Sequence, residues 1–118
     1  MDLYQKRLPQ LRCLPFSPPQ EFKDTFDVNV VGVQIVTQAF LPLLKAGAKK
    51  TIVNISSFLA SLEYTDGRYK NFAYHAYSLT KTAVNFLVRD YAAELAEEGF
   101  TVIAMNPGVQ DIETLTNC

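Results

Sequence analysis

The sequence predicts an α/β fold with a partial doubly wound parallel sheet, in the order helix, strand, helix, strand. Two short runs, 51–56 and 100–106, are rich in β-branched residues and apolar almost throughout, as in parallel strands covered on both faces. Two long segments, 18–45 and 74–98, carry apolar residues at mostly three- and four-residue steps and predict helices. A helix between two buried strands implies a parallel pair joined by a crossover.

The flanking segments divide the chain into a lead-in at 1–17, one domain at 18–108 and a polar tail at 109–118. Ser17 and Gln20 predict an N-cap and a capping box for the first helix. Residues 58–72 predict a loop with a turn signal. Gly99 predicts the end of the second helix.

The composition indicates an ordinary soluble protein of 118 residues, 48% hydrophobic and 19% charged. A net charge of −1 gives no reason to expect nucleic acid or an anionic membrane as a partner. Two cysteines, Cys13 and Cys118, are too few for a disulfide scaffold and suit a reducing compartment. We see no secretory signal and no uninterrupted apolar run of about 20 residues, so we expect a cytoplasmic protein.

The second predicted helix carries Tyr77 and Lys81, four residues apart and therefore on one face. A nearby cation favours the phenolate and lowers the pKa of a tyrosine, so that it can exchange a proton near neutral pH. The plain alternative is a solvated helix face that carries both side chains without a catalytic role.

Both predicted strands end in polar or turn-forming residues, Ser56 and Ser57 after the first and 106–108 (Asn-Pro-Gly) after the second. In open α/β sheets, ligands bind at the carboxyl ends of the strands. The helix of Tyr77 begins at that same edge. Three polar features that are distant in sequence therefore converge on one predicted site.

With these residues the chain resembles the short-chain dehydrogenase/reductase superfamily, most closely small carbonyl reductases of the C-factor or sniffer type. The resemblance covers residues 18–108 and implies part of a Rossmann-like fold. Its four motifs are 29–32 (Asn-Val-Val-Gly), 53–57 (Val-Asn-Ile-Ser-Ser), 77–81 (Tyr-Ser-Leu-Thr-Lys) and 106–108 (Asn-Pro-Gly).

The resemblance implies a role for each site residue. Tyr77 would be the general acid/base, and Lys81 would lower its pKa and hold the nicotinamide ribose. Ser57 would hydrogen-bond the substrate oxygen, or, in the alternative, cap a backbone group. Asn29 would bend its helix and hold a proton-relaying water, or be an interior Asn bonded to a backbone carbonyl.

The implied cofactor is NADP or NAD, and this chain would contact its nicotinamide half. Its binding residues would be Asn29, Tyr77, Lys81, Pro107 and Gly108, with Thr114 as a doubtful further contact. No metal is implied. The implied partners are a small carbonyl substrate and a second copy of the chain, packed through the two long helices.

The sequence departs from the family pattern on the dinucleotide side. Its five glycines, at 32, 47, 67, 99 and 108, form no Gly-rich turn for a pyrophosphate. Three functions therefore stay open: an NAD(P)-dependent oxidoreductase acting on a carbonyl or alcohol, a non-catalytic truncated family member, and an epimerase-type relative.

Overall fold

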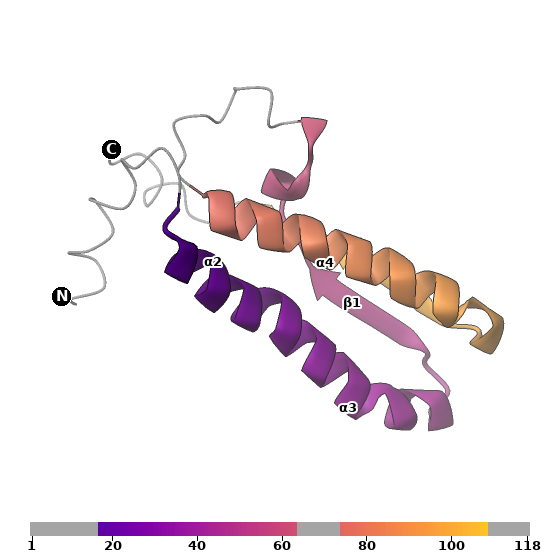
Figure 1. Ribbon diagram of the computed structural model, residues 1–118. Helices are drawn as coiled ribbons and strands as arrows, with labels where there is room; N and C mark the ends of the chain where they lie inside the picture. The colour runs from indigo at the N-terminus through magenta and orange to yellow at the C-terminus, as the bar shows by residue number, and fades with distance from the viewer. Residues whose placement is uncertain (1–16, 64–73, 109–118) are drawn as a thin grey trace.

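The computed structural model describes residues 17–63 and 74–108 and confirms the α/β fold with helix, strand, helix and strand in that order (Figure 1). The lead-in up to residue 16, the loop residues 64–73 and the tail lie outside the described residues. The elements are α2 (Pro19–Phe26), the π-helical turn η1 (Asp27–Val31), α3 (Gly32–Ala46), β1 (Thr51–Ile55), the 3-10 turn η2 (Phe58–Ala60), α4 (His75–Glu94), the 3-10 turn η4 (Ala96–Glu98) and β2 (Thr101–Met105).

The two strands pair in parallel, as predicted, with Thr51 opposite Thr101 and Ile55 opposite Met105. Backbone hydrogen bonds continue past both ends of the pair. The amide of Thr101 donates to the carbonyl of Lys50 at 2.8 Å, and the amide of Ser56 donates to the carbonyl of Met105 at 2.7 Å. The carboxyl ends of β1 and β2 therefore lie side by side, which brings the residues after each strand to one edge.

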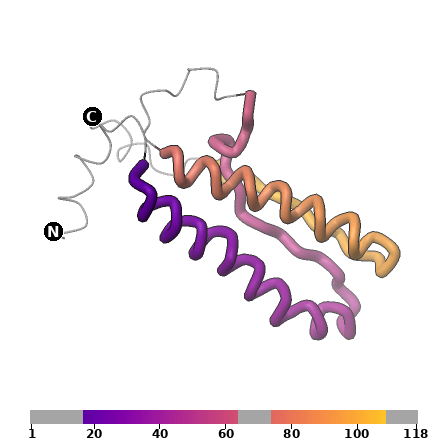
Figure 2. Tube along the Cα trace, viewed as in Figure 1, coloured from indigo at the N-terminus to yellow at the C-terminus, as the bar shows by residue number. Residues whose placement is uncertain are grey.

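The first helix is continuous from α2 through η1 into α3 and runs beside α4 (Figure 2). α2 and η1 pack directly on α4, whereas α3 diverges from it toward its own C-terminus. The π-helical turn places one extra residue in the helical ladder, and it is centred on Asn29. A bend at this position was expected from the resemblance.

The predicted N-cap at Ser17 is wrong. The helix begins at Pro19, and Pro18 occupies the cap position without a side-chain acceptor. The hydroxyl of Ser17 is buried and accepts from the amide of Ala76 at 3.4 Å, in the first turn of α4. Gln20 does not cap either, since its amide donates to Asp24 at 2.7 Å. Neither proline has an N–H group, so the helix start offers fewer donors that need a cap.

The core lies between α4, the two strands and the inner side of the first helix. Its buried members are Val84, Val88, Leu95, Phe100 and Val102. Half-buried residues of α3 and β1 pack against them, among them Leu41, Leu44 and Ile52.

The expectation that both strands are buried on both faces is wrong for the described residues. Val53 and Ile55 of β1 and Ile103 and Met105 of β2 are exposed, whereas Val102 is buried. Side chains alternate between the two faces of a strand, and the described helices cover one of these faces. The apolar composition of the strands suits a sheet with a second layer on its other face.

The continuous helix Pro19–Ala46 is, among the described residues, the one helix long and apolar enough to cross a membrane by length and composition. Its most apolar window has a mean hydropathy of 1.4, and 6% of that window is buried. A helix that packs against other helices in a soluble protein can have the same length and composition. The helix also carries Asp24 and Asp27 in its first third.

A glycine at the turn between η4 and β2 allows the left-handed backbone conformation of that turn to be tested. Gly99 has a φ of 78°, in the left-handed region, and a Cβ added there would meet no atom within 4 Å. Gly99→Ala should therefore lower the free energy of unfolding by about 1–2 kcal/mol, through backbone strain alone. Chemical denaturation measures it.

The matched control is Gly47→Ala, because Gly47 has a φ of −84° and an added Cβ would make only ordinary contacts. Its stability should stay within about 0.5 kcal/mol of the unsubstituted chain or rise slightly. An equal loss for the two variants would contradict the left-handed turn at Gly99.

Candidate active site

The amino end of α4 lies at the carboxyl ends of the strands, and Lys81 joins the two directly. Its Nζ donates to the carbonyl oxygen of Ile55 at 2.9 Å, at the last residue of β1. A parallel crossover imposes this arrangement, because the helix must run back along the strands before β2 begins. Lys81 thus stands at the edge where residues 56–57 and 106–108 leave the sheet.

Tyr77 lies one turn before Lys81 on the same stripe of α4. The Nζ of Lys81 is 5.6 Å from the centre of the Tyr77 ring, within reach of a cation–π interaction. The ring of Tyr74 meets that of Tyr77 edge-on, with centroids 6.5 Å apart and planes at 67°. Tyr77 is half-buried, so its ring is held from two sides and still borders solvent.

Burial lowers the pKa of Lys81 below its ordinary value of 10.5. The physical cause is desolvation, because taking an ammonium out of water penalises its charged form. The hydrogen bond to Ile55 partly compensates for the lost hydration. A cation held at this depth keeps a stronger field on its neighbours than a fully solvated one.

The two serines after β1 have different environments. Ser56 is 6% exposed and its hydroxyl donates to Oδ1 of Asn85 at 2.6 Å. Ser57 is half-buried, and its hydroxyl oxygen accepts from the amide of Leu59 at 3.2 Å, which caps η2. A serine hydroxyl has one donor and two acceptor positions. Capping η2 therefore leaves the O–H group of Ser57 able to donate to a substrate oxygen.

Asn29 connects the π-helical turn to the helix of Tyr77. Its Nδ2 donates to the hydroxyl of Thr80 at 3.1 Å, and that hydroxyl donates to the carbonyl of Tyr77 at 2.8 Å. Thr80 is fully buried. The described partner of Asn29 is therefore a hydroxyl on α4, not the backbone carbonyl of the plain alternative. The chain of bonds fixes the first turn of α4, where Tyr77 lies.

Pro107 and Gly108 follow β2 in a turn closed by a side chain. The amide of Gly108 donates to Oδ1 of Asn106 at 3.1 Å, and Gly108 has a φ of 81°. Both residues are exposed at the edge that carries Lys81. Thr114, the doubtful further contact, lies outside the described residues.

Three residues that hold this edge together were not identified from the sequence: Thr80, Thr82 and Asn85. Thr82 donates to the carbonyl of Ala60 at 2.9 Å. The sequence did contain a signal for Asn85. It follows Lys81 by four positions, so it lies on the same face of the helix as Lys81 and Tyr77. Thr80 was not singled out, although it lies within the 77–81 motif. Among the described residues, no group of three or more His, Cys, Asp or Glu is placed to hold a metal ion.

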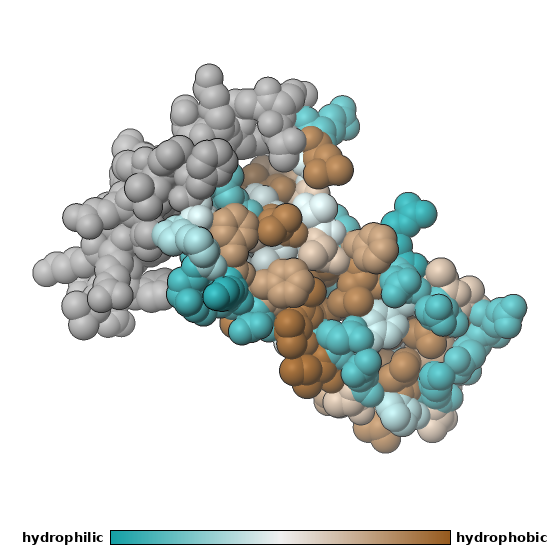
Figure 3. All heavy atoms as spheres, in the orientation of Figure 1, coloured by the Kyte–Doolittle hydropathy of each residue, from teal (hydrophilic) through white to brown (hydrophobic). Residues whose placement is uncertain are grey.

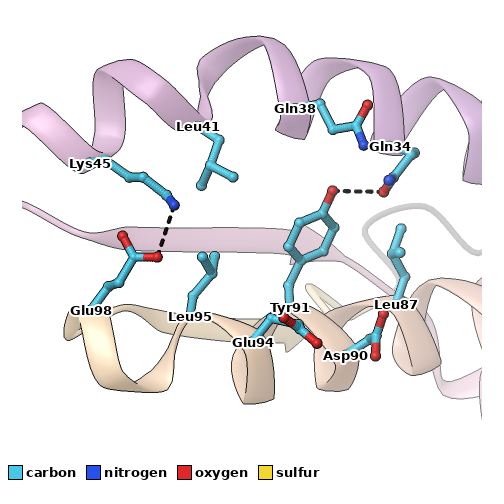
Figure 4. Close-up of a pocket in the computed structure, with 10 residues that line it drawn as sticks. All are labelled: Gln34, Gln38, Leu41, Lys45, Leu87, Asp90, Tyr91, Glu94, Leu95 and Glu98. Atoms are coloured by element: carbon cyan, nitrogen blue, oxygen red, sulfur yellow. Dashed lines mark hydrogen bonds and ion pairs between the residues drawn. The ribbon is translucent and has the colours of Figure 1, made fainter.

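A polar groove of about 360 Å³ lies between α3 and the second half of α4 (Figure 4). It is bridged by the hydrogen bond from Tyr91 to Gln34 at 2.8 Å and by the ion pair of Lys45 with Glu98 at 2.8 Å. Asp90 and Glu94 add two carboxylates to its wall. The groove begins roughly 15 Å along α4 from Tyr77, so it is separate from the candidate active site.

Comparison with known sequences identifies a matching family. The profile of the short chain dehydrogenase family matches residues 12–117. An uncharacterized oxidoreductase of Schizosaccharomyces pombe is 37% identical over 93 residues, which are 79% of this chain and 35% of that protein. The C-signal protein of Myxococcus xanthus is 36% identical over 85 residues, 71% of this chain and 48% of that protein. The chain thus spans about a third to a half of these relatives.

Two solved structures share the fold. The putative carbonyl reductase Sniffer of Caenorhabditis elegans superposes with a TM-score of 0.71 at 26% identity, over 81% of this chain and 45% of that one. The NADPH-bound carbonyl reductase from chicken fatty liver superposes with a TM-score of 0.71 at 25% identity, over 78% of this chain and 38% of that one.

The lowered pKa of Lys81 makes a prediction about stability. The unfolded chain binds more protons than the folded chain between the folded pKa of Lys81 and 10.5, so stability should rise with pH across that window. Lys81→Met removes this contribution. The stability of the unsubstituted chain minus that of Lys81→Met should therefore increase as the pH rises from the lowered pKa of Lys81 toward 10.5.

Denaturant titrations at several pH values measure this difference, and titrating groups distant from Lys81 cancel because both proteins share them. Lys49→Met, at an exposed position before β1, controls for the loss of a lysine. A difference that stays flat or falls with pH would contradict the desolvated position of Lys81.

Proposed function

The chain belongs to the short-chain dehydrogenase family, and on that premise we propose that it carries the catalytic part of an NAD(P)-dependent oxidoreductase acting on a carbonyl or alcohol. The family match agrees with the resemblance inferred from its motifs. The observation that carries the proposal is the contact of Lys81 with Ile55 at 2.9 Å, which brings the Tyr77 helix to the strand ends.

Tyr77 is the proposed general acid/base. Reduction of a carbonyl develops negative charge on its oxygen, and a phenol can donate its proton to that oxygen as the charge appears. In the reverse direction the phenolate accepts the alcohol proton. The half-buried ring borders solvent, and its first-turn position is held by the bonds from Asn29 through Thr80.

Lys81 and Ser57 are proposed to set the electrostatics around Tyr77. The partly desolvated ammonium lies 5.6 Å from the centre of the Tyr77 ring, close enough to act on charge that develops there. The hydroxyl of Ser57 would donate to the same substrate oxygen. Donors fixed before the reaction stabilise a developing oxyanion by several kcal/mol, since they need no reorganisation during the step.

The donor set at this edge fits the nicotinamide side of an NAD(P) cofactor. Lys81 uses one of its three donor hydrogens on Ile55, so others can reach ribose hydroxyls. Pro107 and Gly108 are exposed beside it, where they can border the nicotinamide. When bound, the cofactor supplies or accepts the hydride. The chicken carbonyl reductase named above carries NADPH, and we extend that cofactor, or NAD, to the intact fold here.

A non-catalytic role is the second candidate, and one observation favours it. The five glycines form no Gly-rich turn, so the sequence given contains no evident pyrophosphate site. Titration of the chain with NADPH, followed by nicotinamide fluorescence, separates the two functions. Weak or absent binding favours the non-catalytic candidate for this chain alone, and a micromolar dissociation constant favours the enzyme.

A second copy of the chain is the proposed macromolecular partner, with a small carbonyl compound as the substrate and the cytoplasm as the location. Large apolar side chains are exposed along the first helix and α4, and Figure 3 shows apolar side chains gathered over the helices on one face of the molecule. They are Phe26, Val28, Val31, Ile35, Val36, Phe40 and Leu43 on the first helix and Leu79 and Phe86 on α4. Exposed apolar surface of this extent marks an interaction site.

Substitution of Tyr77 tests the catalytic assignment. In a protein that joins this chain to a Gly-rich dinucleotide-binding segment, Tyr77→Phe should slow NADPH-dependent carbonyl reduction by about 10²–10⁴-fold, because the general acid is lost. The dissociation constant for NADPH should stay within about threefold. Tyr74→Phe is the matched control and should retain most of the turnover. Retention of most of the turnover by Tyr77→Phe would refute Tyr77 as the acid.

The oligomeric state tests the proposed self-association. Light scattering after size exclusion should give a mass above the 13.2 kDa of one chain. Phe86 is 74% exposed on α4, so Phe86→Glu should shift the mass toward one chain without unfolding it, because a carboxylate resists burial in an apolar interface.

The control for added charge is Ala48→Glu, at an exposed position between α3 and β1. It should leave the mass of the unsubstituted chain unchanged. A monodisperse monomer of 13.2 kDa that melts cooperatively would overturn the proposal.

A further inference from the structure

We propose that Asn85 is a positioning residue, which acts through Ser56 to hold the Ser57 hydroxyl beside the first turns of α4. This inference rests on the proposed function, since Ser57 matters for the reaction only if the chain acts on a carbonyl or alcohol. Asn85 itself does not touch substrate or cofactor in this proposal. It acts through the hydrogen bond of 2.6 Å that it accepts from the Ser56 hydroxyl.

The residues before and after Ser57 in the sequence both contact α4. Before it, Lys81 donates a hydrogen bond of 2.9 Å to the carbonyl of Ile55, and Asn85 accepts one from the hydroxyl of Ser56. After it, the Thr82 hydroxyl lies 2.9 Å from the carbonyl of Ala60. The chain passes here from β1 into η2, and Ser57 itself is extended with a φ of −152° and a ψ of 152°. Fixed points on both sides therefore define where its side chain lies.

Asn85 provides the stronger of the two side-chain anchors. The Thr82 hydroxyl is 2.9 Å from the carbonyl of Ala60 and also 2.9 Å from that of Ser78. One hydroxyl hydrogen cannot serve both acceptors fully, so the bond to Ala60 is shared. The Ser56 hydroxyl, by contrast, has Asn85 as its partner at a short distance.

Burial makes the loss of this bond costly. Ser56 is 6% exposed, and its amide is already bonded to Met105 across the sheet at 2.7 Å. Without the Asn85 oxygen, the hydroxyl must stay unpaired in the interior or rotate toward another partner. A displacement of the Ser56 backbone toward another partner would move the next residue, which is Ser57. Positioning thus follows directly from the covalent connection.

The geometry of α4 couples Asn85 to the proton-transfer residues. Tyr77, Lys81 and Asn85 follow one another at four-residue steps, so they lie along one stripe of a single helix. The stripe is roughly 12 Å long, from the general acid at one end to the anchor at the other. The residue before Ser57 is therefore anchored to the same helix that carries Tyr77 and Lys81.

Amide hydrogen exchange, resolved at single residues by NMR, tests this role on the whole chain. The amide of Leu59 donates to the Ser57 hydroxyl oxygen, and that of Ala60 donates to the Ser57 carbonyl at 3.0 Å, so both report on Ser57. Asn85→Leu, similar in size but without an acceptor, should speed exchange at both amides by about three- to tenfold. Asn85→Asp keeps an acceptor oxygen and should restore most of the protection.

The control variant is Tyr91→Phe, which removes another hydrogen bond of α4, the one to Gln34 at 2.8 Å. It should leave exchange at Leu59 and Ala60 unchanged. Unchanged exchange in Asn85→Leu would overturn the proposal, and so would an equal rise across β2 and α4, which indicates a general loss of stability. Failure of Asn85→Asp to protect the two amides would overturn it as well. The readout needs no cofactor or turnover, so a failed carbonyl assay would count only against the proposed function.

Discussion

The hydrogen bond from Lys81 to the carbonyl of Ile55 is the contact on which the candidate site depends. It joins the second turn of α4 to the last residue of β1, at the edge where both parallel strands end. A parallel pair needs a crossover helix, and the return of that helix along the sheet brings its first turns to this edge. The fold thereby brings the first turns of α4, with Tyr77 and Lys81, to the end of β1, where Ser56 and Ser57 follow, although these residues are up to 25 positions apart.

The same contact explains why the pKa of Lys81 is lowered at the candidate site. Lys81 is drawn toward the sheet, loses part of its hydration and has a lowered pKa as a result. The bonds from Asn29 through Thr80 to the Tyr77 carbonyl, and from Ser56 to Asn85, fasten α4 on both sides of Lys81. These polar contacts are buried or half-buried, so each is costly to leave unmade. The candidate site residues on α4 are therefore fixed by contacts within the chain itself.

The sequence predicted the elements well, because each has a local signal. The β-branched runs around Val53 and Val102 identified both strands, and Gly99 marked the turn before β2, where its left-handed conformation favours glycine. The motif resemblance brought Tyr77, Lys81, Ser57 and Asn29 together as candidates.

Long-range partners had no such signal. Ser17 looked like a local cap but bonds to Ala76, 59 positions away, and Ser56 finds Asn85 at a separation of 29. Strand burial was overestimated because an apolar strand does not show how many layers cover it.

Isotope-edited NMR tests the central claim, that α4 delivers Lys81 to the end of β1, most directly. Because Nζ of Lys81 is 2.9 Å from the carbonyl oxygen of Ile55, its terminal methylene protons should show nuclear Overhauser effects to the α proton of Ser56, which lies on the same side of the trans peptide bond as that oxygen. Such effects, absent in Lys81→Met at the same frequencies, are the predicted result. Effects from Lys81 to water alone, with none to residues 55–57, would contradict the arrangement of helix and sheet described here.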